Sequence, residues 1–114
     1  MIAIDIKVQT RDEGLWAIVD VEGEVDVFTA PKLREQLLTI LGRGAEKVVV
    51  NLAGVDFMDS TGLGVLVGGL KRMRERDGTL ALAGAHGTVL RVLNITGLDS
   101  VFALHGTVED ATRS

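Results

Sequence analysis

Two hydroxyl side chains stand between an acid and a glycine in the stretch FMDSTGLG, where Asp59 precedes Ser60 and Gly62 follows Thr61. Hydroxyls beside glycines occur in phosphate-binding loops, in nucleophile elbows, and at sites that another enzyme phosphorylates. The first two of these chemistries require a particular spacing of residues, so the sequence itself can exclude them.

The glycine spacing does not fit a nucleotide-binding loop. A P-loop has the pattern G-x-x-x-x-G-K-[ST], because its lysine must reach the terminal phosphates, but Gly69 is followed by Leu70 before the first lysine. The dinucleotide fingerprint G-x-G-x-x-G also fails, because Gly68 comes one residue too late after Gly62 and Gly64.

Hydrolytic and metal-dependent chemistry is not favoured either. A nucleophile elbow has the pattern G-x-S-x-G, and Met58 occupies the position of the first glycine before Ser60. The two histidines, His86 and His105, have no informative spacing, and we interpret both as surface residues. The absence of cysteine excludes disulfides, thiolate metal ligands and cysteine nucleophiles. We therefore predict a protein that is not an enzyme and needs no cofactor or metal.

Acidic side chains alternate along the segment DVEGEVD, which begins at Asp20. A calcium loop of the EF-hand type would need glycine at its sixth position and glutamate at its twelfth. This chain has Val25 and Pro31 there, so we interpret these acids as outward-facing side chains at the end of a strand.

The charge balance argues against nucleic acid and anionic membranes as partners. Twelve basic and sixteen acidic side chains give a net charge of −4. The basic cluster KRMRER lies at the end of a predicted helix, where cations complement the helix dipole. The first ten residues lack the features of a signal peptide, and the longest apolar run, Leu63–Leu70, is too short to span a membrane. We expect a cytoplasmic protein.

Period-two alternation predicts an N-terminal β-hairpin. Isoleucine and valine alternate with other residues from Ile2 to Val8, and LWAIVDVE follows the same pattern after a turn around Asp12–Gly14. The segment KVVVNLAGV is continuously apolar, as a strand covered on both faces would be. TLALAG and SVF are predicted to be two further short strands.

Three helices and a helical tail are predicted between and after these strands. Thr29 is expected to cap the first helix, with Pro31 in its first turn and Gly42 directly after its end. The second helix is expected over Ser60–Arg76, the third over TVLRVLNITG, and one or two helical turns from Thr107.

The order β-β-α-β-α-β-α-β-α implies a largely parallel sheet with right-handed crossovers. We predict a single α/β domain over residues 1–114: a mixed, mostly parallel sheet of about five strands, packed with about four helices, with the N-terminal hairpin as its antiparallel part. Helical periodicity leaves Met58 and Val65 undecided between core and surface. It places five neighbouring apolar residues in the core: Phe57, Leu63, Leu66, Val67 and Leu70.

Ser60 has two physical explanations. It follows a buried strand and opens a helix, so its hydroxyl could simply cap that helix. It could instead be phosphorylated, since the N–H groups of a helix N terminus accommodate a phosphate, and the added charge beside Asp59 would repel an acidic partner. Gly62 and Gly64 would let the backbone of another protein approach closely.

The segment FMDSTGLGVLVGGLKRM resembles the signature of the bacterial anti-sigma factor antagonists, which are STAS domains. VEGEVDVFTAPKLREQL is similar to the family segment G-E-[LI]-D-x-x-[TS]-A, and RVLNITGLDSVF to its late helix and strand. The resemblance thus covers nearly the whole chain, and it is greatest to the actinobacterial antagonists.

This resemblance implies a partner-switching protein that is phosphorylated at Ser60, the serine after the aspartate of D-S-[ST]-G-L-G. In the family, the unphosphorylated antagonist binds an anti-sigma factor that is also a serine/threonine kinase, which releases a sigma factor. Phosphorylation ends this binding, and a PP2C-type phosphatase restores it. The implied partner surface comprises the loop Gly23–Thr29 and the exposed side of the second helix. Eight residues are singled out in it: Gly23, Glu24, Asp26, Thr29, Asp59, Thr61, Gly62 and Gly64.

Two alternatives stay open. A STAS domain could instead be a scaffold of a stressosome-like assembly, or an accessory subunit of a lipid-transport complex, without a sigma-factor partner. The second alternative is a small nucleotide-binding or hydrolytic protein that uses the glycine-rich turn. It predicts a nucleotide affinity that Gly62→Val removes without unfolding the protein.

Overall fold

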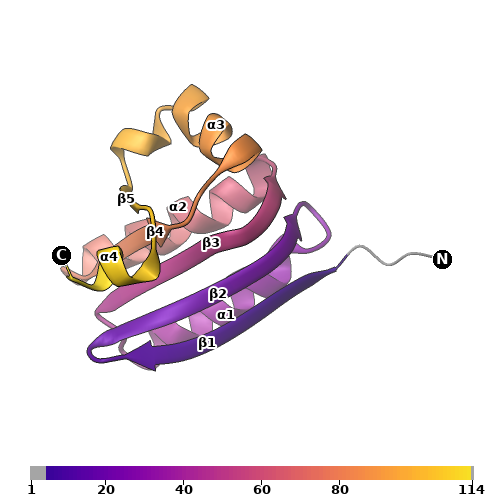
Figure 1. Ribbon diagram of the computed structural model, residues 1–114. Helices are drawn as coiled ribbons and strands as arrows, with labels where there is room; N and C mark the ends of the chain where they lie inside the picture. Colours follow the sequence, from indigo (N-terminus) through magenta and orange to yellow (C-terminus); the bar gives the residue numbers. More distant parts are fainter. Residues whose placement is uncertain (1–4, 114) are drawn as a thin grey trace.

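The computed structural model describes residues 5–113, which form a five-stranded sheet with helices packed on both of its faces (Figure 1). The strands are β1 (Ile6–Glu13), β2 (Trp16–Val25), β3 (Lys47–Met58), β4 (Thr79–Ala83) and β5 (Ala103–His105). The helices are α1 (Ala30–Gly42), α2 (Ser60–Glu75), α3 (Gly87–Ile95) and α4 (Val108–Arg113), with a short 3-10 helix, η1 (Leu98–Ser100), before β5.

The strands lie in the order β1-β2-β3-β4-β5. Only β1 and β2 are antiparallel, and the other three neighbouring pairs are parallel, each connected through a helix. This confirms the predicted mixed sheet with an N-terminal hairpin. The hairpin turn lies slightly later than expected, at Gly14 and Leu15, because Asp12 and Glu13 still pair with β2. Ile2 and Ile4 of the predicted first strand lie outside the described residues.

Two local predictions are wrong: where the first helix ends, and which residues form the last strand. Gly42 is the last residue of α1 rather than the residue after it, and the left-handed backbone that ends the turn belongs to Gly44, with φ 87°. SVF is not a strand, because the N–H groups of Val101 and Phe102 both donate to the carbonyl of Leu98 and keep this segment turned. The last strand, β5, begins directly afterwards.

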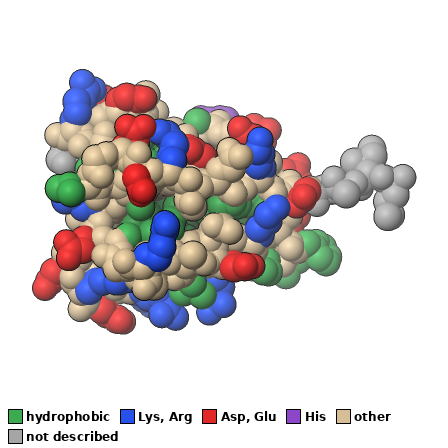
Figure 2. Space-filling view, turned by 90° about the horizontal axis from the view of Figure 1, so that it is seen from below, with side chains coloured by type: hydrophobic (Ala, Val, Ile, Leu, Met, Phe, Trp, Pro, Cys, Tyr) green, Lys and Arg blue, Asp and Glu red, His purple; other side chains and the backbone are tan. Residues whose placement is uncertain are grey.

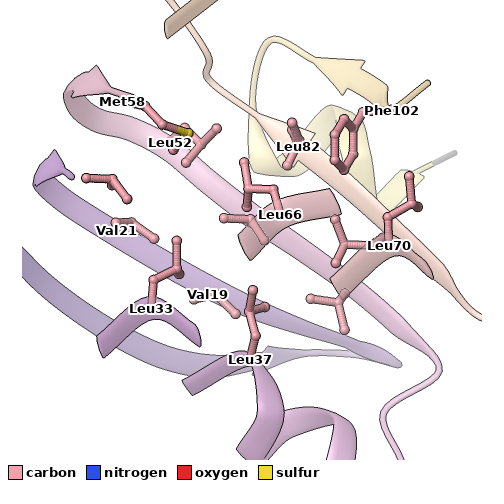
Figure 3. Packing of buried hydrophobic residues seen from close by; sticks show 14 of the residues in the cluster. Val19, Val21, Leu33, Leu37, Leu52, Met58, Leu66, Leu70, Leu82 and Phe102 are labelled. Carbon is pink, nitrogen blue, oxygen red and sulfur yellow. The ribbon is translucent and has the colours of Figure 1, made fainter. Parts of the chain in front are cut away.

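The main core lies between the sheet and the pair α1 and α2, which sit behind the sheet in Figure 1. In Figure 3, leucines from both helices point toward valines and leucines of the strands: Leu33, Leu37, Leu66 and Leu70 face Val19, Val21, Leu52 and Leu82. A second cluster on the opposite face joins Trp16, Ile18 and Val49 to the α4 residues Val108 and Ala111. This explains why β3 is apolar on both sides, as the sequence predicted.

The predicted core near Ser60 is correct except at two positions. Leu63, Leu66 and Leu70 are buried, as is Met58, whose place the sequence left undecided. Val67 is only half-buried, as is Val65. Phe57 is 44% exposed, because neighbouring residues of a strand point to opposite faces and Met58 takes the inward position.

Candidate functional site

The carboxyl ends of β2 and β3 bring the two predicted parts of the site together. The strands are parallel, and Val25 at the end of β2 pairs with Met58 at the end of β3. The N–H of Asp59 then donates to the carbonyl of Val25 at 3.1 Å. The loop from β2 into α1 and the turn from β3 into α2 therefore emerge side by side at one edge of the sheet.

Asp59, and not Ser60, caps α2. Its backbone is extended, and its Oδ1 accepts hydrogen bonds from the N–H of Thr61 at 2.9 Å and of Gly62 at 3.2 Å. Ser60 already belongs to the first turn of the helix. The interpretation of Ser60 as the capping residue is therefore wrong, because a cap needs the non-helical backbone that only Asp59 has.

The hydroxyl of Ser60 is exposed, and it makes no hydrogen bond to any of residues 5–113. Thr61 beside it is also exposed. Because the cap comes from Asp59, the fold does not depend on the Ser60 hydroxyl. The side chain is thus positioned at a helix start, accessible from outside, and available for modification.

The two glycines after Thr61 have different surroundings. A Cβ at Gly62 would lie 2.7 Å from Val25 Cγ1 and 2.7 Å from Met58 Cγ, so this glycine allows α2 to pack closely on the strand ends. It is buried and does not offer its backbone to a partner. Gly64 is exposed and has open space in front of it, as expected for a surface position.

The turn before α1 is fixed by two polar side chains. Oδ1 of Asp26 accepts from the N–H of Phe28 at 2.9 Å and of Thr29 at 3.0 Å. The Thr29 hydroxyl donates to the carbonyl of Glu24 at 2.7 Å and accepts from the N–H of Asp26 at 2.9 Å. Thr29 occupies the predicted capping position but makes no side-chain cap to α1. Asp26 and Thr29 therefore shape the turn.

This rigid turn displays two apolar side chains, which lie within the predicted loop Gly23–Thr29 but were not singled out there. Val27 is 58% exposed and Phe28 is 88% exposed. The signal was present in the sequence, since DVFT places two apolar residues between the two polar residues that build the turn. An aromatic side chain held in water on a fixed backbone is a typical anchor for a protein partner.

The remaining predicted residues of the partner surface lie at the end of β2. Glu24 is half-buried. Gly23 has a left-handed φ of 111°, and a Cβ there would lie 2.6 Å from the carbonyl oxygen of Asp5. Gly23 is therefore required by the close approach of the residue that precedes β1.

The alternating acids of β2 do not all face solvent. Asp20 is half-buried and accepts hydrogen bonds from Nε of Arg11 at 2.7 Å and Nδ2 of Asn51 at 2.8 Å. Burial raises the pKa of the Asp20 carboxyl, but these two hydrogen bonds and the charge of Arg11 outweigh it and lower the pKa below its ordinary value. Glu22, in contrast, is exposed as predicted.

The basic cluster at the end of α2 connects neighbouring elements. Nη2 of Arg74 donates to the carbonyl of Val101 at 3.2 Å, and Nη2 of Arg76 donates to the carbonyl of Leu41 at 2.6 Å. Figure 2 shows acidic and basic side chains interspersed over the face that it presents. Of the two histidines, His86 is exposed with Nε2 3.0 Å from the carbonyl of Ala53, and His105 is half-buried.

Comparisons with known proteins agree over most of the chain. A family model described as the STAS domain matches residues 3–111. An anti-sigma-B factor antagonist from Staphylococcus epidermidis is 39% identical over 106 residues, which cover 93% of this chain and 96% of that protein. One from Staphylococcus aureus is 35% identical over 106 residues, covering 93% and 98%.

The fold is also similar to solved structures of anti-sigma factor antagonists. The chain is similar to the crystal structure of an anti-sigma factor antagonist from Mycobacterium paratuberculosis, with a TM-score of 0.88 and 28% identity, covering 95% of this chain and 92% of that one. Among residues 5–113, no helix is both long and apolar enough to cross a membrane. With its signature turn at Ser60 and a family match over residues 3–111, this chain belongs to the STAS domain family.

Proposed function

We propose that this protein is an anti-sigma factor antagonist that binds its partner when Ser60 is unphosphorylated and is released when Ser60 is phosphorylated. The observation that carries the proposal is the exposed Ser60 hydroxyl, which makes no hydrogen bond within the described chain, directly after the cap of α2. The relatives named above, at 39% and 35% identity, are anti-sigma-B factor antagonists.

The partner is an anti-sigma factor that is also a serine/threonine kinase, as the resemblance implies. In the modification step, Oγ of Ser60 attacks the γ-phosphorus of ATP, the bond to the leaving ADP breaks, and the hydroxyl proton passes to a general base of the kinase. A PP2C-type phosphatase hydrolyses the phosphate ester and regenerates the hydroxyl. The antagonist is thus a substrate and a binding protein in this cycle, which acts on a sigma factor indirectly and in the cytoplasm.

Asp59 makes phosphorylation an electrostatic switch. Its carboxylate already accepts from the N–H groups of Thr61 and Gly62, so a phosphate on Ser60 would meet a negative charge there instead of unpaired donors. The phosphate would add about −1.5 to −2 charges to this small surface. Desolvating it against a partner becomes costly, and a loss of about 3 kcal/mol would weaken binding on the order of a hundredfold.

We derive the binding surface from the residues around Ser60 that are exposed or half-buried. We assign the partner contacts to Thr61 and Gly64 of α2, to Glu24, and to the displayed side chains Val27 and Phe28 of the neighbouring turn. Asp26, Thr29, Gly23 and Gly62 hold this surface in shape, and Asp59 connects its two parts through the hydrogen bond from its N–H to the carbonyl of Val25.

The test is a pull-down from the native cytosol with three baits: the wild-type protein, Ser60→Asp, and Asn94→Asp as a control that adds the same charge at an exposed position of α3. The proposal expects the wild type and the control to retain an ATP-binding anti-sigma factor kinase, and Ser60→Asp to lose it. If all three baits retain the same proteins, Ser60 is not the switch. The chain would then act as a scaffold or accessory subunit.

A further inference from the structure

A groove runs between α1 and α2. Its central pocket has a volume of about 260 Å³ and is lined by Leu38 and Leu41 of α1 and by Gly64, Val65 and Gly68 of α2. A second compartment of about 640 Å³ shares Leu38 and Val65 with it and extends to Ala30 and Pro31 at the start of α1. Glu35 and Thr39 of α1 also line this second compartment. The groove therefore combines apolar walls from both helices with a few polar side chains.

The groove exists because two glycines stand one helical turn apart on α2. A Cβ at Gly64 or Gly68 would meet nothing within 4 Å, whereas one at Gly69 would lie 3.2 Å from a methyl group of Leu80. Close packing therefore explains Gly69 but neither of the other two. Each glycine in a helix interior costs about 1 kcal/mol relative to alanine, and packing within residues 5–113 offsets none of it at Gly64 and Gly68. Both contribute open space instead.

The central pocket carries positive charge. Arg34 of α1 and Arg72 of α2 line it, no acidic side chain does, and the hydroxyl of Thr61 is a third polar group. Neither arginine forms an ion pair or a hydrogen bond with any part of the chain that the structure describes. Two unpaired guanidinium groups over apolar walls are notable in a chain whose net charge is −4.

We infer that this groove binds a small amphipathic anion, which has an aliphatic body and a single carboxylate or phosphate-ester head group. The guanidinium groups of Arg34 and Arg72 and the hydroxyl of Thr61 supply donors for the head group. The wall formed by Leu38, Val65 and Pro31 receives the aliphatic body. Apolar pockets with a few convergent polar groups are the usual form of small-molecule sites.

This inference does not depend on the proposed function, because the groove is complete in the chain itself. The groove nevertheless lies next to Ser60, since Thr61 lines both compartments and directly follows Ser60 in the sequence. A ligand in the groove would therefore lie beside the surface that a partner meets at Ser60.

The test is an NMR titration of the ¹⁵N-labelled full chain with octanoate and octyl phosphate, followed through amide chemical shifts. Octan-1-ol, which has an eight-carbon chain but no charge, is the control ligand. We expect saturable shifts at Thr61, Gly64, Val65 and Gly68 with at least one anion. Octan-1-ol should bind at least about tenfold more weakly, because it lacks the charge-assisted hydrogen bonds. The anion that binds more tightly identifies the head group.

Three variants test the site itself. Gly68→Leu places a side chain in the open space and should abolish the shifts while the melting temperature stays the same or rises. The double change Arg34→Gln and Arg72→Gln should weaken binding by about tenfold or more, whereas Arg91→Gln on α3, an exposed arginine outside the groove, should not. The inference is overturned if neither anion shifts these amides, if octan-1-ol binds equally well, or if the groove variants keep wild-type affinity.

Discussion

The carboxylate of Asp59 accepts a hydrogen bond from the backbone N–H of Gly62 at 3.2 Å, so the cap of α2 is supplied from outside the helix. Ser60 lies between these two residues in sequence but takes no part in the cap. A hydroxyl that is not needed for folding can be modified without loss of the helix. The structural and regulatory roles are therefore divided between two adjacent side chains.

The division of roles predicts different stabilities for two alanine variants. Asp59→Ala removes the acceptor for two N–H groups and should lower the free energy of unfolding by about 1 kcal/mol. Ser60→Ala should change it by less than about 0.5 kcal/mol, because the hydroxyl makes no hydrogen bond within residues 5–113. Urea denaturation followed by circular dichroism measures both. A larger loss for Ser60→Ala would mean that the serine is the cap after all.

A second pair of variants separates the two glycines of the signature. Gly62→Ala puts a methyl group 2.7 Å from side-chain atoms of Val25 and Met58 and should destabilise the fold by about 1–3 kcal/mol. Gly64→Ala meets open space and should stabilise it by up to about 1 kcal/mol, because alanine is the better helix former. The melting temperatures of both variants and the wild type, measured in the same buffer, test these two changes in stability. Equal effects would contradict the packing role assigned to Gly62.

The sequence predicted those parts of the fold that depend on periodicity. The hairpin, the buried β3 and the order of helices all follow from patterns of two or of three to four residues. Local hydrogen bonding was harder to predict. The sequence indicated Ser60 as a possible cap of α2, and only the extended backbone of Asp59 shows that the residue before it is the cap. Thr29 was placed correctly, but its hydroxyl bonds within the turn instead of capping α1.

Surface features set by non-local geometry could not be predicted in the same way. Phe57 fits the pattern of a core residue, yet it faces outward because Met58 points into the core. The groove between α1 and α2 depends on where two helices distant in sequence come together, so no spacing of residues reveals it. Phe28 was detectable, because apolar residues between turn-forming Asp26 and Thr29 have nowhere to be buried.

The lowered pKa of Asp20 predicts a pH-dependent contribution to stability. The folded-state pKa lies below that of the unfolded chain, about 3.9, so ionised Asp20 stabilises the fold above that pH. The contribution is lost as the pH falls through the folded-state pKa. Asp20→Asn should therefore cost up to about 1 kcal/mol at neutral pH and progressively less in acid. Asp12→Asn, at an exposed acid in β1, serves as the control. If the difference in unfolding free energy between the wild type and Asp20→Asn stays constant as the pH falls, Asp20 does not make this pH-dependent contribution.

Phe28 should contribute to partner binding without contributing to folding. Its side chain is 88% exposed, and Phe28→Ala leaves the hydrogen bonds of Asp26 and Thr29 intact. Calorimetry with the captured anti-sigma factor kinase should show affinity reduced by about tenfold or more, as for an aromatic anchor. Leu15→Ala removes a similarly exposed side chain, 84% exposed, from the β1–β2 hairpin turn and should leave affinity unchanged. Equal affinities for the two variants would remove Phe28 from the binding surface.

The identity of the phosphorylated residue can be decided between two adjacent exposed hydroxyls. Thr61 lines the groove between α1 and α2, whereas Ser60 does not line that groove and stands directly beside the Asp59 cap. Exposure alone does not distinguish them, so the prediction comes from position: a single phosphate is transferred, and it is carried by Ser60. Incubation with the captured kinase and ATP, followed by mass spectrometry, should show one phosphate on the wild type and on Thr61→Ala, and none on Ser60→Ala. A folded Ser60→Ala protein that accepts phosphate at the normal rate would show that the switch lies elsewhere, even if the partner binds as proposed.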